Sequence, residues 1–184
     1  MSRTVHQIKV TLRGTRPPIW RRIVTYSDIT LFELHEILQV TMGWMDSHLH
    51  QYRKRETYYG NPNDEFGIRR KNEKKVRLNE VLQKANDRMV YEYDFGDGWE
   101  HDLVLEKVEY AQEGMKYPTV LKGKGACPPE DVGGVYGYYD FLEAISNHRH
   151  PEHKNMIDWC GEFDPNEFDI EEANSYFHGI NKDA

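Results

Sequence analysis

The chain has 184 residues, of which 38% are hydrophobic, 12% aromatic and 30% charged, and its formal net charge is -7. This composition suits one globular domain, and because no run of 18 apolar residues occurs, it excludes a transmembrane helix. Two cysteines, Cys127 and Cys160, are too few for a disulfide framework, and the start MSRTVHQIKV lacks an apolar signal core, so we expect a cytoplasmic protein.

Charge is divided unevenly along the chain. Residues 1–88 hold 17 Lys and Arg against 10 Asp and Glu, a net +7, whereas residues 89–184 hold 7 against 21, a net -14. A basic face would attract an anionic partner, but the two halves could instead neutralise each other across an interface, and we favour this second interpretation. Nucleic acid is not favoured as a partner, since the acidic half would repel phosphates.

Alternating apolar residues predict two strands, at residues 5–13 and 19–26, joined by the turn GTRPP into an antiparallel hairpin. Arg21 and Arg22 fall on opposite faces of the second strand. At least one of the two must therefore lie beside apolar side chains, with an anion or a backbone carbonyl as its partner.

A capping box of Thr30 and Glu33 predicts a helix from residue 30 to about residue 42. Short strands are expected at residues 48–52 and 57–60. In the first of these, His48 and His50 point to the same face, a spacing that suits metal ligands.

Residues 61–75 form a polar segment that we expect to be a loop, followed by a short helix at residues 78–85. The loop carries the basic residues Arg69, Arg70 and Lys71. They are either part of a solvated segment, the interpretation we favour, or a patch that faces phosphate groups.

The most distinctive stretch is YDFGDGWEH, residues 93–101. Its glycines predict a tight turn between a strand at residues 89–95 and a long strand at residues 99–110. Trp99 and His101 share the inward face of the long strand. We expect His101 to be buried, with Asp94 or Asp97 as its hydrogen-bond partner.

After a strand expected at residues 117–122, the loop 123–134 is stiffened by two prolines and flanked by glycines. It carries Cys127, Glu130 and Asp131. Stiff polar loops often line sites, although these carboxylates could equally cap a following helix.

The last part of the chain is predicted to be helical. One helix is expected at residues 136–147, a second from residue 150 to 161, and a third opens at a capping box of Asp169 and Glu172. Three histidines lie close together at the second helix start, and they either bind metal or only cap and solvate the helix. They are His148, His150 and His153.

Together these elements predict an α+β fold in a single domain spanning residues 1–184, sheet-rich over about 1–125 and helical over about 135–179. The strand-strand-helix-strand order at the start indicates a β-grasp-like arrangement. The later long hairpin would extend or face this antiparallel or mixed sheet.

Four motifs, PPIWRR, YDFGDGWEH, GACPPEDVGG and HPEHKNMIDWCGEFDPNEFD, together resemble the plasmid pRiA4b ORF-3-like family. The resemblance covers nearly the whole chain and implies a shared fold and an association with plasmids or mobile elements. It implies no catalytic residues. A resolvase activity, which the label of some family members suggests, would need a nucleophilic serine with an arginine cluster, and the sequence shows neither that setting nor a separate helix-turn-helix domain.

We favour a non-enzymatic binding module for a protein, a peptide or an anionic partner, because no catalytic spacing is present and Tyr and Trp are abundant. The alternatives are a small metal-assisted hydrolase with its site between the hairpin 93–101 and the loop 123–134, and a nucleic-acid-associated protein of mobile elements. The sequence requires no cofactor, and a divalent metal is the one that its donors would take.

Three sets of candidate residues follow from these hypotheses. A ligand site or structural polar network is expected from Asp94, Asp97, Trp99, His101, Cys127, Glu130 and Asp131. Anion binding is expected from Arg21, Arg22, Arg69, Arg70 and Lys71. The candidate metal ligands are His48, His50, His101 and Cys127.

Overall fold

The computed structural model describes residues 3–63 and 69–180. The strands over these residues are β1 (Thr4–Leu12), β2 (Trp20–Tyr26), β3 (His50–Lys54), β4 (Thr57–Gly60), β5 (Arg70–Asn72), β6 (Arg88–Tyr93), β7 (Trp99–Tyr110) and β8 (Thr119–Lys124). The helices are α1 (Leu31–Met42), α2 (Leu78–Val81), α3 (Gly134–Ser146), α4 (His153–Cys160) and α5 (Ile170–Ile180), with a 3-10 helix η1 at Glu73–Lys75.

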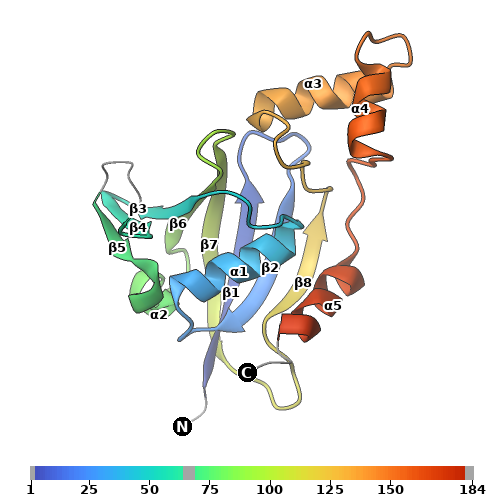
Figure 1. The fold of residues 1–184 in the computed structure, drawn as a ribbon. Helices are drawn as coiled ribbons and strands as arrows, with labels where there is room; N and C mark the ends of the chain where they lie inside the picture. Colours follow the sequence, from blue (N-terminus) through green and yellow to red (C-terminus); the bar gives the residue numbers. More distant parts are fainter. Residues whose placement is uncertain (1–2, 64–68, 181–184) are drawn as a thin grey trace.

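The described strands form one eight-stranded sheet in the order β5-β4-β3-β6-β7-β1-β2-β8. Its neighbours are antiparallel except β4 and β5, which run parallel. Figure 1 shows α1 lying across one face of the sheet, α5 beside β8, and the α3–α4 pair at one end. No helix of the described chain is both long and apolar enough to cross a membrane.

The predicted α+β class, with a mixed sheet and C-terminal helices, is confirmed, and so is the β1–β2 hairpin. The strand that follows α1 pairs with β4 and β6, whereas β1 lies between β7 and β2, so this order does not show a β-grasp arrangement. The predicted loop at 61–75 contains β5 and η1, and its residues 64–68 lie outside the described part of the chain.

Local signals account for α1 and for the face of the sheet that it covers. Thr30 Oγ1 accepts a hydrogen bond from the Glu33 amide at 3.1 Å, and the Glu33 carboxylate accepts one from the Thr30 amide at 2.6 Å, so the predicted capping box is present. Gly43 then ends the helix with a positive φ of 92°. Apolar side chains of α1 pack on the inward residues of β1 and β7 and form the core.

The opposite face of the sheet carries ion pairs between the two oppositely charged parts of the chain. Arg13 contacts Glu100 at 2.5 Å and Asp102 at 2.6 Å, and Arg22 contacts Glu106 at 2.6 Å. Arg22 lowers the pKa of the Glu106 carboxyl below its ordinary value. These contacts agree with mutual neutralisation of the two halves, and they occupy Arg22, which was a candidate for binding an external anion.

His101 is buried as predicted, with no exposed surface. Its Nδ1–H donates to the carbonyls of Trp99 at 3.1 Å and Tyr91 at 3.4 Å, and Nε2 makes no hydrogen bond to any described residue. The prediction of Asp94 or Asp97 as its partner is wrong, because both carboxylates are held by backbone amides in and beyond the turn. Burial lowers the pKa of His101 to about 4.

This pKa predicts a loss of stability in weak acid. The imidazole has an ordinary pKa of 6.5 in the unfolded chain and about 4 in the fold, so the unfolded state binds more protons between these values. The contribution of neutral, buried His101 to the free energy of unfolding is complete above about pH 6.5 and is lost as the pH falls toward 4. At about 1.4 kcal/mol per pH unit, His101 accounts for a loss of about 2 kcal/mol between about pH 6.5 and 5.

Urea unfolding of the wild type and of His101→Leu, each at about pH 7.5 and about pH 5, measures this contribution. We expect the acid-induced loss to be smaller by about 2 kcal/mol in the variant. Comparing each protein with itself cancels any general destabilisation by the substitution. Equal acid-induced losses in the two proteins would contradict the assignment.

Candidate functional site

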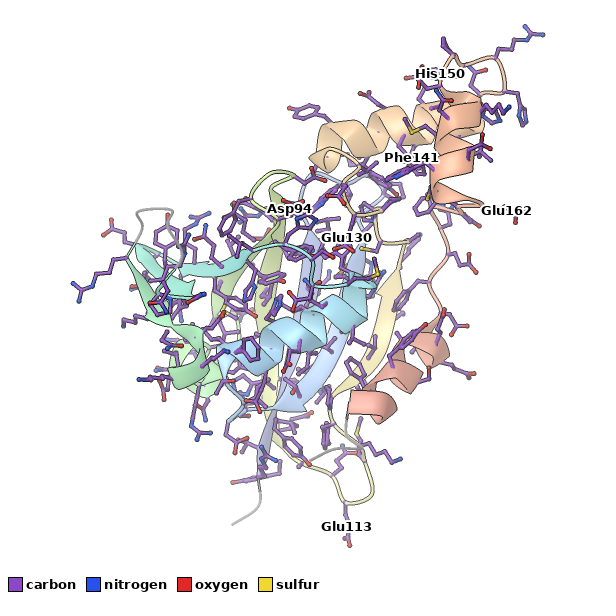
Figure 2. All side chains as sticks on the ribbon, in the orientation of Figure 1. Asp94, Glu113, Glu130, Phe141, His150 and Glu162 are labelled. Carbon is purple, nitrogen blue, oxygen red and sulfur yellow. The ribbon has the colours of Figure 1, made fainter. Side chains whose placement is uncertain are left out.

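The hairpin 93–101 and the loop 123–134 meet at one end of the sheet, as the hydrolase hypothesis requires (Figure 2). Tyr93 Oη donates to Glu130 Oε1 at 2.5 Å, and the Gly133 amide donates to Asp97 Oδ2 at 3.1 Å. Asp97 and Glu130 therefore hold the loop against the hairpin. Both candidates have an identified structural role.

The segment that follows α1 also contacts this junction. Trp44 Nε1 donates to the carbonyl of Pro128 at 3.0 Å, and the Met45 amide donates to Glu130 Oε2 at 3.1 Å. Trp44 is itself buried between the rings of Tyr93 and Trp99, with centroids at 4.9 and 6.0 Å. Trp99 therefore supports the site from within the core and does not line it.

At this junction His48, Asp94 and Asp131 come together from three separate segments. Their ligand atoms all lie within 4.8 Å of one another. His48 Nε2 is 3.1 Å from Asp131 Oδ1 and 3.8 Å from Asp94 Oδ2. The Nε2 atom is buried and forms no hydrogen bond with any described residue, because the Asp131 contact lacks hydrogen-bond geometry.

Backbone conformation positions the aspartates of this region. Asp94 has a φ of 56° and Asp131 a φ of 61°, and neighbouring Asp46 also has a φ of 56°. Positive φ is unfavourable for residues other than glycine, though Asp and Asn tolerate it best. Such conformations gather at functional sites, where the surrounding structure holds a side chain in a required direction.

A second histidine–carboxylate cluster lies next to the first. The rings of His35 and His50 stack with centroids 3.4 Å apart and planes inclined by 6°. His35 Nε2–H donates to Asp46 Oδ1, and His50 Nε2–H donates to Glu73 Oε2, both at 2.8 Å. Burial, together with the neighbouring His50, lowers the pKa of His35 to about 4.

The stacked pair is poorly arranged to hold one metal ion, although His35, Asp46 and His50 each offer a ligand atom within 4.8 Å of the others. A metal lies in the plane of the imidazole that binds it, and two parallel stacked rings cannot both direct a lone pair at one ion without rotating. His48, Asp94 and Asp131 are therefore the better ligand set.

His48 and His50 consequently do not form the ligand pair expected from their spacing. β3 begins only at His50, so the two side chains are not fixed on one strand face. His48 contacts the hairpin and the loop, while His50 stacks on α1. A cavity of about 490 Å³ lies beside both histidines, and its lining includes Asn61, Asn72 and Lys74.

Cys127 and Arg21 lie close to each other and belong to neither cluster. The Arg21 guanidinium is buried, and donates to the carbonyls of Thr41 at 3.1 Å and of Trp20 and Lys124 at 3.0 Å. This confirms the expected carbonyl partner, and burial lowers the pKa of Arg21 to about 10. Burial also raises the pKa of the Cys127 thiol, which disfavours the thiolate that a metal would need.

The predicted basic patch at residues 69–71 is divided by strand β5. Arg70 points inward, where Nε donates to Gln51 Oε1 at 3.0 Å, whereas Arg69 and Lys71 are exposed. An alternating strand turns neighbouring side chains to opposite faces. The three residues therefore do not form the single surface that the phosphate-facing hypothesis required.

The histidines near α4 have local structural partners. His153 Nδ1–H donates to the Ala144 carbonyl at 2.8 Å, and its Nε2 lies 3.0 Å from His148 Nδ1. His150 Nδ1 accepts from the Glu152 amide at 3.2 Å. These contacts match the capping interpretation, and the three do not form a metal-ligand group among the described residues.

The fold and the junction define an α+β domain with one mixed sheet and a histidine–carboxylate cluster at one end of it. The chain belongs to the plasmid pRiA4b ORF-3-like protein family, whose sequence model matches residues 4–172. This confirms the resemblance seen in the motifs.

Two relatives are similar to the chain over nearly its whole length. The chain is 39% identical over 183 residues to the uncharacterized protein y4hQ of Sinorhizobium fredii, a match that covers 99% of this chain and 91% of the relative. The crystal structure of the protein of unknown function MM3350 from Methanosarcina mazei Go1 is similar, with a TM-score of 0.84 and 35% identity. That match covers 94% of this chain and 97% of the other.

Substitutions at two adjacent glycines test the contact between the loop 123–134 and the hairpin 93–101. Both have positive φ, 93° at Gly133 and 67° at Gly134. A Cβ at Gly134 would meet the Asp97 carbonyl oxygen at 2.3 Å, whereas one at Gly133 would approach nothing closer than 3.6 Å. We expect Gly134→Ala to destabilise the protein by about 1–3 kcal/mol more than Gly133→Ala, because both place a side chain at positive φ but only Gly134→Ala also makes it overlap a backbone oxygen.

Chemical unfolding of the two variants beside the wild type measures this difference. Gly133→Ala serves as the matched control, because it introduces the same methyl group one residue earlier. Two variants of equal stability would show that α3 does not rest on the hairpin turn as described.

Proposed function

We propose that the protein binds a divalent metal ion through His48, Asp94 and Asp131, and that it is a metal-assisted hydrolase. One observation carries the proposal. A buried imidazole nitrogen without a hydrogen bond lies within coordinating reach of two carboxylates, and all three come from different segments. The site lies between the hairpin 93–101 and the loop 123–134.

The donor set suits a catalytic ion better than a structural one. One imidazole nitrogen and two carboxylate oxygens match Zn²⁺ or Mn²⁺. Three protein ligands leave coordination positions for water and substrate, and the Asp131 side chain is 70% exposed, so the site is open to solvent. A bound cation would also offset the repulsion between the two carboxylates.

A bound ion would supply the activation of water near neutral pH, since coordination lowers the pKa of a water molecule. In a hydrolysis the hydroxyl group adds to the acyl or phosphoryl centre, and the proton goes to the leaving group. The cavity beside His48 supports a small polar substrate, because amide and ammonium groups occur in its lining.

Metal binding is tested by titrating chelator-treated protein with Mn²⁺ and Zn²⁺ in a calorimeter, after elemental analysis of the protein as purified. We expect about one ion per chain and an affinity at least about tenfold weaker in His48→Gln and in Asp131→Asn, equivalent to about 1.4 kcal/mol. His148→Gln and Asp140→Asn are matched controls outside the cluster and should bind as the wild type does. Metal binding that survives both ligand substitutions would contradict the site.

Hydrolysis is tested separately with p-nitrophenyl acetate and p-nitrophenyl phosphate. Turnover should appear when Zn²⁺ or Mn²⁺ is added to the metal-free protein and fall at least about tenfold in Asp94→Asn, in line with the loss of one ligand. Asp140→Asn should retain the activity. A protein that binds the ion but turns over neither ester, nor any member of a wider hydrolase panel, would sink the catalytic part of the proposal.

A further inference from the structure

A groove of about 630 Å³ lies between the end of α1 and the segment that leads into α5. It shares no residue with the cluster of His48, Asp94 and Asp131. Its apolar lining consists of side chains from α1, the segment after it, the loop 123–134, the approach to α5 and α5 itself. They include Val40, Met42, Trp44, Phe163, Phe168 and Ala173.

Two large apolar side chains at this groove are open to solvent. Met45 is 81% exposed and Tyr176 is 59% exposed, and both line the groove. Scattered exposed apolar residues are ordinary, but a concave apolar lining bordered by such side chains marks an interaction surface. Methionine adapts its shape to a partner, and tyrosine offers a large rigid contact area.

Charge selects the kind of partner. Five carboxylates line the groove: Glu162, Asp164, Glu167, Asp169 and Glu172. Among its described lining residues Arg21 is the one cation, and that guanidinium is buried under the ring of Phe168, 3.6 Å away, and bound to three carbonyls. The accessible part of the groove is therefore acidic, and an anionic partner does not fit it.

We propose that this groove docks a segment of a partner protein in which Lys or Arg residues flank a large apolar side chain. The apolar side chain would lie on the groove floor between Met45 and Tyr176. The flanking cations would face the carboxylates, which steer the association and set its specificity. This function is independent of metal binding.

Two of the carboxylates are suitable for a test because the other three accept hydrogen bonds. Glu172 Oε1 accepts one from Tyr176 Oη at 3.3 Å. Asp169 Oδ1 accepts hydrogen bonds from the first amides of α5, and Asp164 Oδ1 accepts one from the Asn166 amide. Glu162 and Glu167 are exposed. Replacing these two residues by Gln removes charge from the groove and leaves the hydrogen bonds of Asp164 and Asp169 in place.

The probe is a fluorescein-labelled peptide of about twelve alternating Lys and Leu residues, with a Glu and Leu peptide of the same length for comparison. By fluorescence anisotropy we expect the Lys peptide alone to bind, and to bind more weakly at about 300 mM than at about 50 mM salt, since salt screens exposed charges. The double variant Glu162→Gln, Glu167→Gln should bind about tenfold more weakly, and so should Met45→Ser.

The control is the double variant Glu56→Gln, Glu113→Gln, which changes the net charge by the same amount at exposed positions outside the groove (Glu113 is labelled in Figure 2). It should bind as the wild type does. If both double variants bind the peptide equally weakly, the affinity depends on overall charge and not on the groove, and the proposal is overturned.

Two further outcomes are decisive. If sedimentation shows a dimer that Met45→Ser dissociates and that the Lys peptide cannot displace, the groove binds a second copy and the proposal fails. Chelator-treated protein should bind the peptide with unchanged affinity. A negative result in the metal titration would therefore not affect the test of peptide binding.

Discussion

Tyr93 connects the three segments that carry the candidate metal ligands, two of them through hydrogen bonds of its hydroxyl group. It donates to Glu130 in the loop and accepts from the Ser47 amide at 3.0 Å, while its own strand leads directly into Asp94. His48 follows Ser47, and Asp131 follows Glu130. Burial and the neighbouring carboxylate raise the pKa of Tyr93, so the hydroxyl remains a donor. One buried phenol thus sets the distances among three side chains that are far apart in the chain.

The surroundings of this junction show how polar groups are accommodated in an aromatic core. His35 accepts a hydrogen bond from Tyr91 Oη at 2.8 Å, and Gln39 donates to the same hydroxyl at 2.9 Å. The stack of His35 on His50 is therefore held by hydrogen bonds on several sides, with each Nε2 directed at a carboxylate. A buried polar network of this kind is stable only when its members have partners. His48 differs from His35 and His50 because its Nε2 forms no hydrogen bond with a described residue. It differs from His101, whose Nε2 also forms none, because His48 lies in a ligand group with the two carboxylates Asp94 and Asp131.

The candidate metal ligands and the acidic groove form two separate surfaces around the same segment after α1. Met45 contributes its amide to the junction through Glu130 and its side chain to the groove. Much of the remaining charge is used internally, since Arg13 and Arg22 pair with carboxylates of the acidic half and Arg21 is buried on carbonyls. The basic half therefore offers less free charge to an anionic partner than its composition indicates. Net charge describes solubility and association, but pairing within the fold decides which charges remain available.

The sequence by itself determined the features that depend on near neighbours. Period-two alternation predicted the inward face of β7 with Trp99 and His101, and side-chain caps located the starts of α1 and α5, because strand pleat and helix capping involve residues one to four positions apart. Four motifs together were sufficient to indicate the family. Only the tertiary structure decided which partners these residues have. It separated His48 from His50, gave His101 carbonyl partners in place of Asp94 or Asp97, and brought Asp131 to His48. Such contacts join segments distant in sequence, and their geometry follows from how the strands are ordered and the loops packed, which no local pattern records.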